Sequence, residues 1–327
     1  MEMYRMKNKV VKVATIAAFV IAAPVSGKAL RMGTGGETGN YYSMGKDIHS
    51  YCAEDISRDI EVASSKGSVD NLLGMTNKEY AIGMVQEDVL QFNAKRSPKK
   101  VNKNRMKVIT GLHEEAVHLL IPKGYKPQNS EKKGWKAWFS SSDGAPKKFD
   151  LAMLKGQKVG SWGGSMVSAE ALGYFYDLNL KVTETKFDVN NNSLPIILVG
   201  GAPYKPVVEY LASGKWDLAP LDYNAISQTA GFYSNQTVNY QINGKVKGVP
   251  TVGIRALLIG KAFRKKSRNA PMTEMATCIY ANVADLADDP DTNPNWSSVY
   301  DHIDSEGQSD WSYFPLNEDK LAEYEEL

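Results

Sequence analysis

The sequence predicts an α/β fold of two lobes, each built on a mainly parallel sheet. Strand-like and helix-like segments alternate along the 327 residues, as in proteins whose neighbouring strands are joined by helices. Glycine-rich turns stand at the ends of several of these strands. A mature chain of roughly 300 residues is also long enough to form two separate hydrophobic cores.

The first residues have the pattern of a secretory signal. Basic residues precede an almost wholly apolar run over 13–23, and small residues then lead to a cleavage site after Gly27 or Ala29. The apolar run is shorter than the roughly 20 residues that span a bilayer. We therefore expect residues 1–27 to be a cleaved signal peptide and the protein to be periplasmic, with an uncleaved N-terminal anchor as the alternative.

The secondary structure can be assigned in order along the chain. Strands are expected over residues 29–33, 59–64, 80–85, 108–112, 117–121, 158–161, 181–185, 218–221 and 251–260. Helices are expected over residues 43–57, 68–77, 87–93, 165–176 and 273–286. If one lobe is discontinuous, two strands cross between the lobes and form a hinge. Lobe 1 then comprises residues 28–118 with 252–327, and lobe 2 comprises residues 119–251.

Charge and cysteine content narrow the class of partner. The full chain has a net charge of +2, and removal of residues 1–27 leaves it near −1. A chain so close to neutral has no electrostatic footprint for nucleic acid or an anionic membrane, and we expect a monomer. The only two cysteines, Cys52 and Cys278, could form a disulfide in an oxidising compartment or remain two separate buried thiols.

The segment 30–45, LRMGTGGETGNYYSMG, leads from a short strand through three close glycines into a helix. Free backbone N–H groups at such a helix start can bind a carboxylate, a phosphate or a carbonyl. The glycine spacing does not fit G-x-G-x-x-G, and no glycine loop closes with G-K-[ST]. The segment therefore predicts a small-ligand loop without a nucleotide cofactor.

Two further segments carry similar polar turns. Residues 62–75 and 80–88 end their strands in serine, glutamine and acidic side chains, which favours a polar rim at one sheet edge. Residues 154–172 give a second strand, glycine turn and helix, whose start could bind a carboxylate. Two such helix starts facing across a hinge would form a clamp. Ordinary capped turns and a plain capped helix are the alternatives.

Motifs for catalysis and metal binding fail in detail. In HEEAVH, residues 113–118, the second histidine comes one position too late for H-E-x-x-H. The acidic run 289–293 starts like a calcium loop but lacks its glycine and its glutamate, and there is no G-x-S-x-G. We expect no enzyme activity, metal or cofactor. Residues 123–150 are expected to form a surface excursion. The alternative is a flap over the cleft or a docking surface for a partner.

Five motifs occur in an order that resembles one family: GTGGETGNYYSMG, SSKGSVDNL, YAIGMVQED, EEAVHLLIPKG and LKGQKVGSWGGS. They resemble the TAXI solute-binding proteins, the extracytoplasmic receptors of tripartite ATP-independent periplasmic (TRAP) transporters. TVGIRALLIG and YFPLNEDKLAEY are similar to the C-terminal half of that family. The resemblance implies a type II-like periplasmic-binding-protein fold, an interlobe cleft and transfer to TRAP membrane subunits. It also implies a small carboxylate ligand, either a glutamate-like amino acid or a dicarboxylate.

The resemblance also gives the candidate ligand-binding residues. Carried over by position, they are Thr34, Gly36, Asn40, Tyr41, Ser65, Ser68, Gln86 and Ser165, with His118 and Trp162 as weaker candidates. Asp222, which follows the strand 218–221, would suit the amino group of an amino acid. Lys66 replaces a family glycine, and the stretches 123–150 and 285–310 are unusual, so ligand and partner surface stay open. The alternatives are a receptor for a membrane signalling sensor and an exported enzyme using the same cleft.

Overall fold

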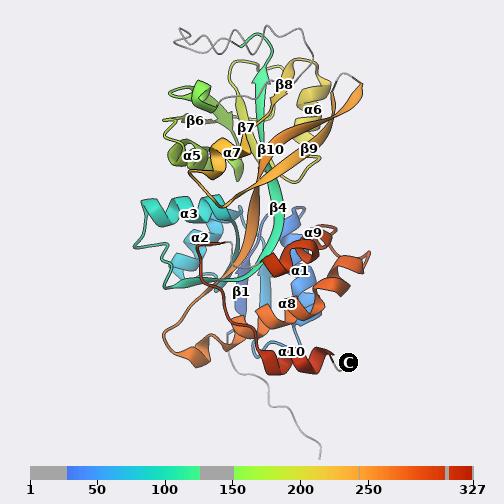
Figure 1. The fold of residues 1–327 in the computed structure, drawn as a ribbon. Helices are drawn as coiled ribbons and strands as arrows, with labels where there is room; N and C mark the ends of the chain where they lie inside the picture. Colours follow the sequence, from blue (N-terminus) through green and yellow to red (C-terminus); the bar gives the residue numbers. More distant parts are fainter. Residues whose placement is uncertain (1–27, 126–150, 243, 306–308, 326–327) are drawn as a thin grey trace, which may run out of the picture.

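The computed structural model describes residues 28–125, 151–242, 244–305 and 309–325 (Figure 1). The described strands form one 10-stranded sheet in the order β2-β1-β3-β10-β4-β7-β5-β6, with β8 paired to β4 and β9 to β10. The sheet passes through two lobes, and helices cover it in each. The predicted α/β, two-lobed fold is confirmed.

The bounds of the elements are as follows. The strands are β1 (Leu30–Gly33), β2 (Ile60–Ala63), β3 (Ile82–Gln86), β4 (Met106–Pro122), β5 (Lys158–Ser161), β6 (Lys181–Glu184), β7 (Ile196–Gly200), β8 (Trp216–Ala219), β9 (Tyr233–Ile242) and β10 (Lys245–Lys261). The helices are α1 (Asn40–Cys52), α2 (Ser68–Asn77), α3 (Glu87–Arg96), α5 (Ser165–Phe175), α6 (Lys205–Ala212), α7 (Tyr223–Ser227), α8 (Ala270–Asp288), α9 (Trp296–His302) and α10 (Glu318–Glu325).

Each lobe has a parallel part of the sheet. In the first lobe β1 pairs in parallel with β2 and β3, and in the second β5 pairs in parallel with β6 and β7. Helices α1, α8 and α9 pack on one face of the first lobe, and α2 and α3 supply apolar side chains to its other core (Figure 1). Helices α5, α6 and α7 cover the second lobe.

Two long antiparallel strands, β4 and β10, run through both lobes (Figure 1). On β4, Leu112 packs in the core of the first lobe and Ala116 in that of the second. On β10, Ala256 packs in the core of the first lobe and Ile254 in that of the second. The pairing register of the two strands shifts just beyond this point, between Arg255 and Leu257. The division of the chain at 118/119 and 251/252 remains a prediction.

Some of the expected elements were wrong in extent. The two short strands over 108–112 and 117–121 are the single strand β4, because a polar stretch at the junction of the cores interrupts its apolar pattern. Strand β10 starts six residues earlier than the expected 251–260. Strands β7 and β9 and helices α6, α7, α9 and α10 were not predicted.

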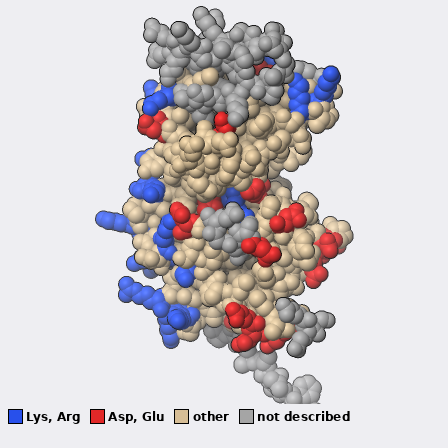
Figure 2. All heavy atoms as spheres, in the orientation of Figure 1, with Lys and Arg blue, Asp and Glu red and all other residues tan. Residues whose placement is uncertain are grey.

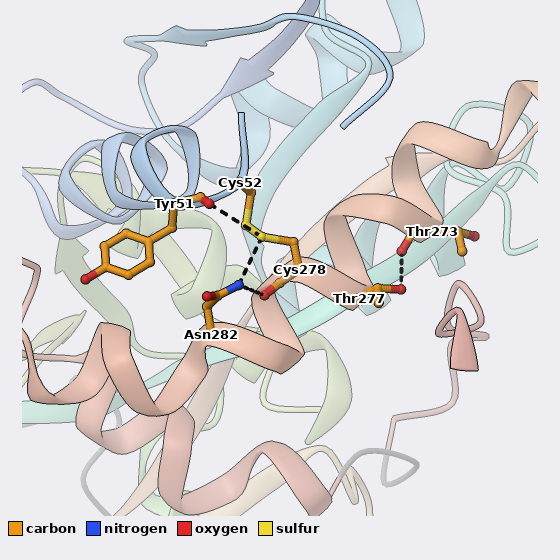
Figure 3. Close-up of a disulfide and its surroundings, with 6 residues drawn as sticks. All are labelled: Tyr51, Cys52, Thr273, Thr277, Cys278 and Asn282. Atoms are coloured by element: carbon orange, nitrogen blue, oxygen red, sulfur yellow. Dashed lines mark hydrogen bonds between the residues drawn. A yellow bond between two sulfur atoms is a disulfide. The ribbon is translucent and has the colours of Figure 1, made fainter. Parts of the chain in front are cut away.

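A disulfide joins Cys52, the last residue of α1, to Cys278 in α8 (Figure 3). The two Cα atoms lie 5.8 Å apart, and both side chains are fully buried. The amide of Asn282 donates a hydrogen bond of 2.9 Å to the backbone carbonyl of Cys278. Of the two alternatives for the cysteines, the structure therefore has the disulfide, which connects the N-terminal and C-terminal parts of the first lobe.

Charge on the visible surface of the first lobe is largely segregated (Figure 2). Figure 2 shows lysine and arginine along the edge that carries α3, and aspartate and glutamate along the edge that carries α8 and α9. The segment 95–103 supplies exposed cations, and the segment 285–304 supplies exposed carboxylates. Within the described part of the chain, no helix combines the length and apolar character needed to cross a membrane. The expected signal peptide and residues 126–150 lie outside the described residues.

Candidate functional site

A cavity of about 450 Å³ lies between the two lobes. The first lobe contributes the turn before α1 and the start of that helix, and the second contributes the turn after β7. Strand β4, which joins the lobes, contributes one carboxylate. The lining residues are Gly35, Gly39, Asn40, Tyr41, Glu115, Val199, Gly200, Gly201, Ala202, Pro203, Tyr204 and Asn295.

The start of α1 presents backbone donors to this cavity. Gly39 is the N-cap residue, and no side chain caps the helix. Gly39 and the first helical residues, Asn40 and Tyr41, all line the cavity. The N–H groups of the first helical turn have no intrahelical acceptor, and the helix dipole adds positive potential there. The α1 start is therefore suited to an oxygen acceptor of a ligand.

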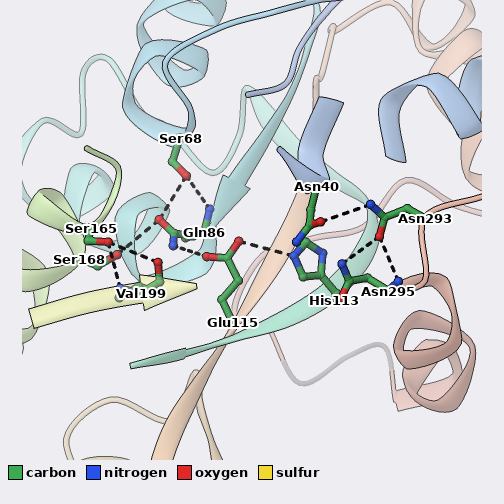
Figure 4. A network of polar contacts seen from close by, with 10 residues as sticks. All are labelled: Asn40, Ser68, Gln86, His113, Glu115, Ser165, Ser168, Val199, Asn293 and Asn295. Carbon is green, nitrogen blue, oxygen red and sulfur yellow. Dashed lines mark hydrogen bonds and ion pairs between the residues drawn. The ribbon is translucent and has the colours of Figure 1, made fainter. Parts of the chain in front are cut away.

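Glu115 supplies the charge of the cavity. Its Oε2 accepts a hydrogen bond of 2.5 Å from Nε2 of Gln86, and its Oε1 lies 3.5 Å from Nε2 of His113 (Figure 4). Among the described lining residues it is the only one with a formal charge, and none is lysine or arginine. Lys66, at the position where the family pattern has glycine, is exposed and does not line the cavity.

Gln86 connects the carboxylate of Glu115 to both lobes. Its backbone N–H donates to Oγ of Ser68, 3.0 Å away, within the first lobe. Its Oε1 accepts from Oγ of Ser68 and from Oγ of Ser168, which belongs to α5 in the second lobe, at 3.4 Å each (Figure 4). The side chain is buried. Gln86 and Ser68 thus position Glu115 and link the lobes, behind the cavity wall.

Tyr41 lines the cavity but buries its hydroxyl. Its side chain is 9% exposed, and the hydroxyl interacts with the side chains of Glu115 and Ser68. Burial, and next the charge of Glu115, raise the pKa of this hydroxyl well above its usual value. The ring packs edge-on against the imidazole of His113, with 5.9 Å between centroids. The hydroxyl therefore stays protonated and can donate to the carboxylate of Glu115.

The acidic C-terminal stretch contributes Asn293 and Asn295 beside the start of α1. Oδ1 of Asn40 accepts a hydrogen bond from the amide of Asn293, 3.3 Å away (Figure 4). Oδ1 of Asn293 in turn accepts from the backbone N–H and the amide of Asn295, at 3.0 and 2.8 Å. The stretch 285–310, which looked unusual in the sequence, places Asn295 in the cavity lining.

Other candidates from the sequence hold the first-lobe turns together. Thr34 is fully buried, and its hydroxyl donates 2.8 Å to the carbonyl of Ala63. The hydroxyl of Ser65 donates to the carbonyl of Thr34 and accepts from the N–H of Gly67. Gly36 stands in the turn before α1, but it is not among the lining residues. These side chains shape the loop without facing the cavity.

The second-lobe candidates are likewise engaged within the fold. Oγ of Ser165 accepts from the backbone N–H of Val199 at 2.9 Å and donates to its carbonyl at 3.3 Å, which ties α5 to β7. Nε2 of His118 lies 2.8 Å from the hydroxyl of Tyr240. Burial lowers the pKa of His118 to about 4, so the ring is neutral near pH 7.

Trp162 and Asp222 also have structural partners. The indole ring of Trp162 packs against the rings of Phe187 and Tyr210, with centroids 6.3 and 6.2 Å away. Oδ1 of Asp222 accepts from the N–H of Asn224, 3.2 Å away, and so caps the short helix α7. Neither residue is in the cavity lining.

Sequence reasoning missed three parts of the site, one of which is Asn295. Glu115 lies in one of the quoted motifs, and because side chains alternate along a strand it shares a face of β4 with His113 while Glu114 points the other way. That alternation was the available signal. The turn from Gly200 to Tyr204 was missed because β7 itself was not predicted.

Metal chemistry has no support in this region. Within the described residues, no cluster of three or more histidine, cysteine, aspartate or glutamate side chains is arranged to hold a metal ion. His113 and His118 lie on a strand, not on the helix that a zincin motif requires. In the acidic run, the carboxylate of Asp289 accepts a hydrogen bond of 2.7 Å from Tyr51.

One family model and several solved structures are similar to the chain. The model of the NMT1-like family matches residues 32–131, which include the α1 turn, Gln86 and Glu115. No curated protein matches the chain. A solved structure from Bordetella bronchiseptica RB50 is similar at 13% identity and a TM-score of 0.46, covering 90% of this chain and 89% of that one.

Two further solved structures are similar at the same level. The GluR0 ligand-binding core in complex with L-glutamate has 12% identity and a TM-score of 0.40, covering 79% of this chain and 95% of that one. A TctC solute-binding protein from Polaromonas has 11% identity and a TM-score of 0.42, covering 91% and 94%. At these TM-scores the similarities support no conclusion about this chain. Its own sheet order and helices show a two-lobed α/β fold (Figure 1).

Proposed function

We propose that this protein is a periplasmic solute-binding receptor that captures a small ligand between its lobes and delivers it to a TRAP transporter. The observation that carries the proposal is the cavity of about 450 Å³, to which both lobes and the crossing strand β4 contribute. A ligand there contacts both lobes only when they are together. It therefore binds the closed state better and shifts the population toward it.

The ligand we propose is a small carboxylate, either a glutamate-like amino acid or a dicarboxylate. The uncapped start of α1, where Gly39, Asn40 and Tyr41 line the cavity, supplies backbone donors suited to a carboxylate. The volume fits a small solute, since pockets for drug-sized ligands begin at roughly 300 Å³. Binding needs no chemical step, so the protein is not an enzyme.

The TRAP membrane subunits are the proposed partner. The match to the NMT1-like family over residues 32–131 supports a role as a binding protein, and the TAXI-like order of motifs supports this transporter class. Residues 1–27 would be removed on export. The near-neutral charge of the remaining chain supports a protein that binds neither nucleic acid nor a membrane surface.

Native mass spectrometry of the mature protein, purified without refolding, tests the proposal. We expect a co-purified small acid that is released unchanged on denaturation, and a smaller radius of gyration by X-ray scattering when it is added back. Chemical turnover of the ligand would contradict a receptor role and favour the enzyme alternative. An empty protein that responds to no amino acid or organic acid in a thermal-shift screen would contradict the proposal.

Transport itself needs a separate experiment. Proteoliposomes that contain TRAP membrane subunits from the same organism should accumulate the ligand only when the mature protein is present. Uptake that is independent of the protein would contradict the transport role and leave the signalling alternative.

A further inference from the structure

We infer that the ligand carries a protonated nitrogen and that Glu115 is the residue that selects it. This rests on the proposed function and narrows its ligand class from carboxylates in general to amine-bearing ones.

The charge of the cavity points to a cation. Glu115 is the one charged side chain among the described lining residues, and no described lysine or arginine is there to neutralise it. A dicarboxylate would place two further negative charges beside Glu115, and no described lining residue carries a counter-charge.

Glu115 has an acceptor available for such a group. Its Oε2 is engaged by the amide of Gln86 at 2.5 Å. Its Oε1 lies 3.5 Å from His113, whose Nε2 forms no hydrogen bond in the described structure. The Oε1 lone pairs can therefore accept an ammonium N–H, and the carboxylate charge makes that bond a strong one.

The surroundings of Glu115 also suit a cation. The aromatic residues Tyr41 and Tyr204 line the same cavity. Aromatic faces attract ammonium groups, and more strongly where water is excluded. Burial raises the pKa of Tyr204, with a further contribution from Glu115, so this ring stays neutral as well.

A second part of the cavity suits an acceptor. The uncapped start of α1 at Gly39 and Asn40 contributes to the lining. Backbone donors there and the carboxylate of Glu115 match a zwitterion, with its acid group at α1 and its amine at Glu115. This arrangement favours the amino-acid class over the dicarboxylate class.

Paired probes that differ only in the amine test the inference. Isothermal titration with the mature protein would compare L-glutamate with glutarate, L-alanine with propionate, and 4-aminobutyrate with butyrate. In at least one pair the amine-bearing member should bind at least 10-fold more tightly. This comparison uses the wild-type chain and does not depend on any variant folding.

Glu115→Gln should abolish that preference because it keeps the shape of the side chain and removes its charge. Glu114→Gln is the matched control, since Glu114 is the preceding residue of β4, is absent from the cavity lining, and accepts a hydrogen bond of 2.5 Å from Gln236. We expect Glu115→Gln to weaken binding of the amine-bearing probe at least 10-fold and Glu114→Gln to leave it unchanged.

The outcomes separate the two levels of the argument. Tighter or equal binding of the amine-free member in every pair that binds, or a preference that survives in Glu115→Gln, overturns the inference while the receptor role stands. If no probe binds and native mass spectrometry finds an empty protein, the proposed function fails and the inference falls with it.

Discussion

The turns before α1 and α5 have similar glycine-rich sequences but different roles. Both follow a short strand, and the sequence predicted that they face each other as a clamp. The turn at Gly35 and Gly39 lines the interlobe cavity, whereas Gly163 and Gly164 do not. Helix α5 contacts α3 across the lobes, and the segment after β7 takes its place in the lining. A glycine turn shows that backbone donors are free, but the packing of the opposite lobe decides whether a ligand can reach them.

The largest effect should come from removing the disulfide that anchors α1. In the described chain, α5 has no such disulfide. Replacing both Cys52 and Cys278 with alanine should lower the free energy of unfolding by about 2–5 kcal/mol, because the cross-link restrains the unfolded chain. Urea denaturation of the variant and the wild type measures this. Ligand affinity should change less than about threefold, because the cavity lies at the other end of the 13-residue helix. An affinity loss that matches the stability loss would contradict this separation.

Gly201→Phe and Gly164→Phe compare the two turns of the second lobe directly. A Cβ atom at Gly201 would lie 4.0 Å from the amide of Asn40 in the first lobe, whereas one at Gly164 meets no atom within 4 Å. Phenylalanine at Gly201 should fill the cavity and weaken binding at least 100-fold, or about 2.7 kcal/mol. Titration with the co-purified ligand measures it. Equal losses in both variants would remove the distinction between the turns.

Asn40→Ala and Ser165→Ala test the first residue of each helix. Asn40 lines the cavity, so we expect its replacement to weaken binding about 10-fold, or 1.4 kcal/mol, with little change in melting temperature. Ser165 makes two hydrogen bonds with the backbone of Val199, so its replacement should cost about 1–2 kcal/mol of stability. Titration and thermal melts of both variants decide this. Weaker ligand binding in Ser165→Ala at unchanged stability would support the hypothesis that the starts of α1 and α5 form a clamp around the ligand.

The smallest effect concerns the contact between α3 and α5. Asp88 is fully buried at the start of α3, and burial raises its pKa to about 7 from 3.8, although the neighbouring Ser168 hydroxyl of α5 lowers it. The native state therefore keeps a proton that the unfolded chain has lost, so the contribution of Asp88 to stability falls as the pH rises toward 7 and then levels off. From pH 6.5 to 7.5, Asp88→Asn should gain about 0.5–1 kcal/mol relative to wild type.

Melting curves of both proteins at the two pH values check this difference. His118, whose pKa is lowered by burial, acts with the opposite sign, but it is present in both proteins and cancels in the comparison. Melting temperatures that move in parallel with pH would show that Asp88 does not titrate in this interval.

The sequence predicted the parts of the fold that are encoded locally. Helix α2 and strand β5 have the predicted bounds, because a glycine turn and an apolar run define each of them. Strand β4 was predicted as two strands because its residues from His113 to Glu115 are polar. These residues lie where the two cores meet and belong to neither core. Strand β9 was missed because polar residues alternate along it and its apolar run is short.

For the site, the sequence identified the start of α1, where Asn40 and Tyr41 line the cavity. It could not identify the turn after β7 or Asn295, because only the tertiary fold brings these segments to α1. The structural roles of Thr34, Ser65 and Ser165 could not be predicted either. The sequence does not show whether a hydroxyl forms a hydrogen bond with the backbone or with a ligand. Of the loops that the resemblance pointed to, the cavity lining includes the turn before α1, whereas Ser65, Gly163 and Gly164 lie outside it.

The disulfide spans a sequence separation of 226 residues, and nearly all of the second lobe lies inside that interval. During synthesis, the chain of the second lobe is complete before Cys278 exists, whereas the first lobe must wait for α8 to cover α1. The second lobe can therefore fold early from contacts within one continuous segment. The first lobe folds last, because its two distant segments must first come together at a cost in chain entropy. A Cys52–Cys278 bond in a newly made molecule thus marks a chain whose synthesis has passed the second lobe and reached α8.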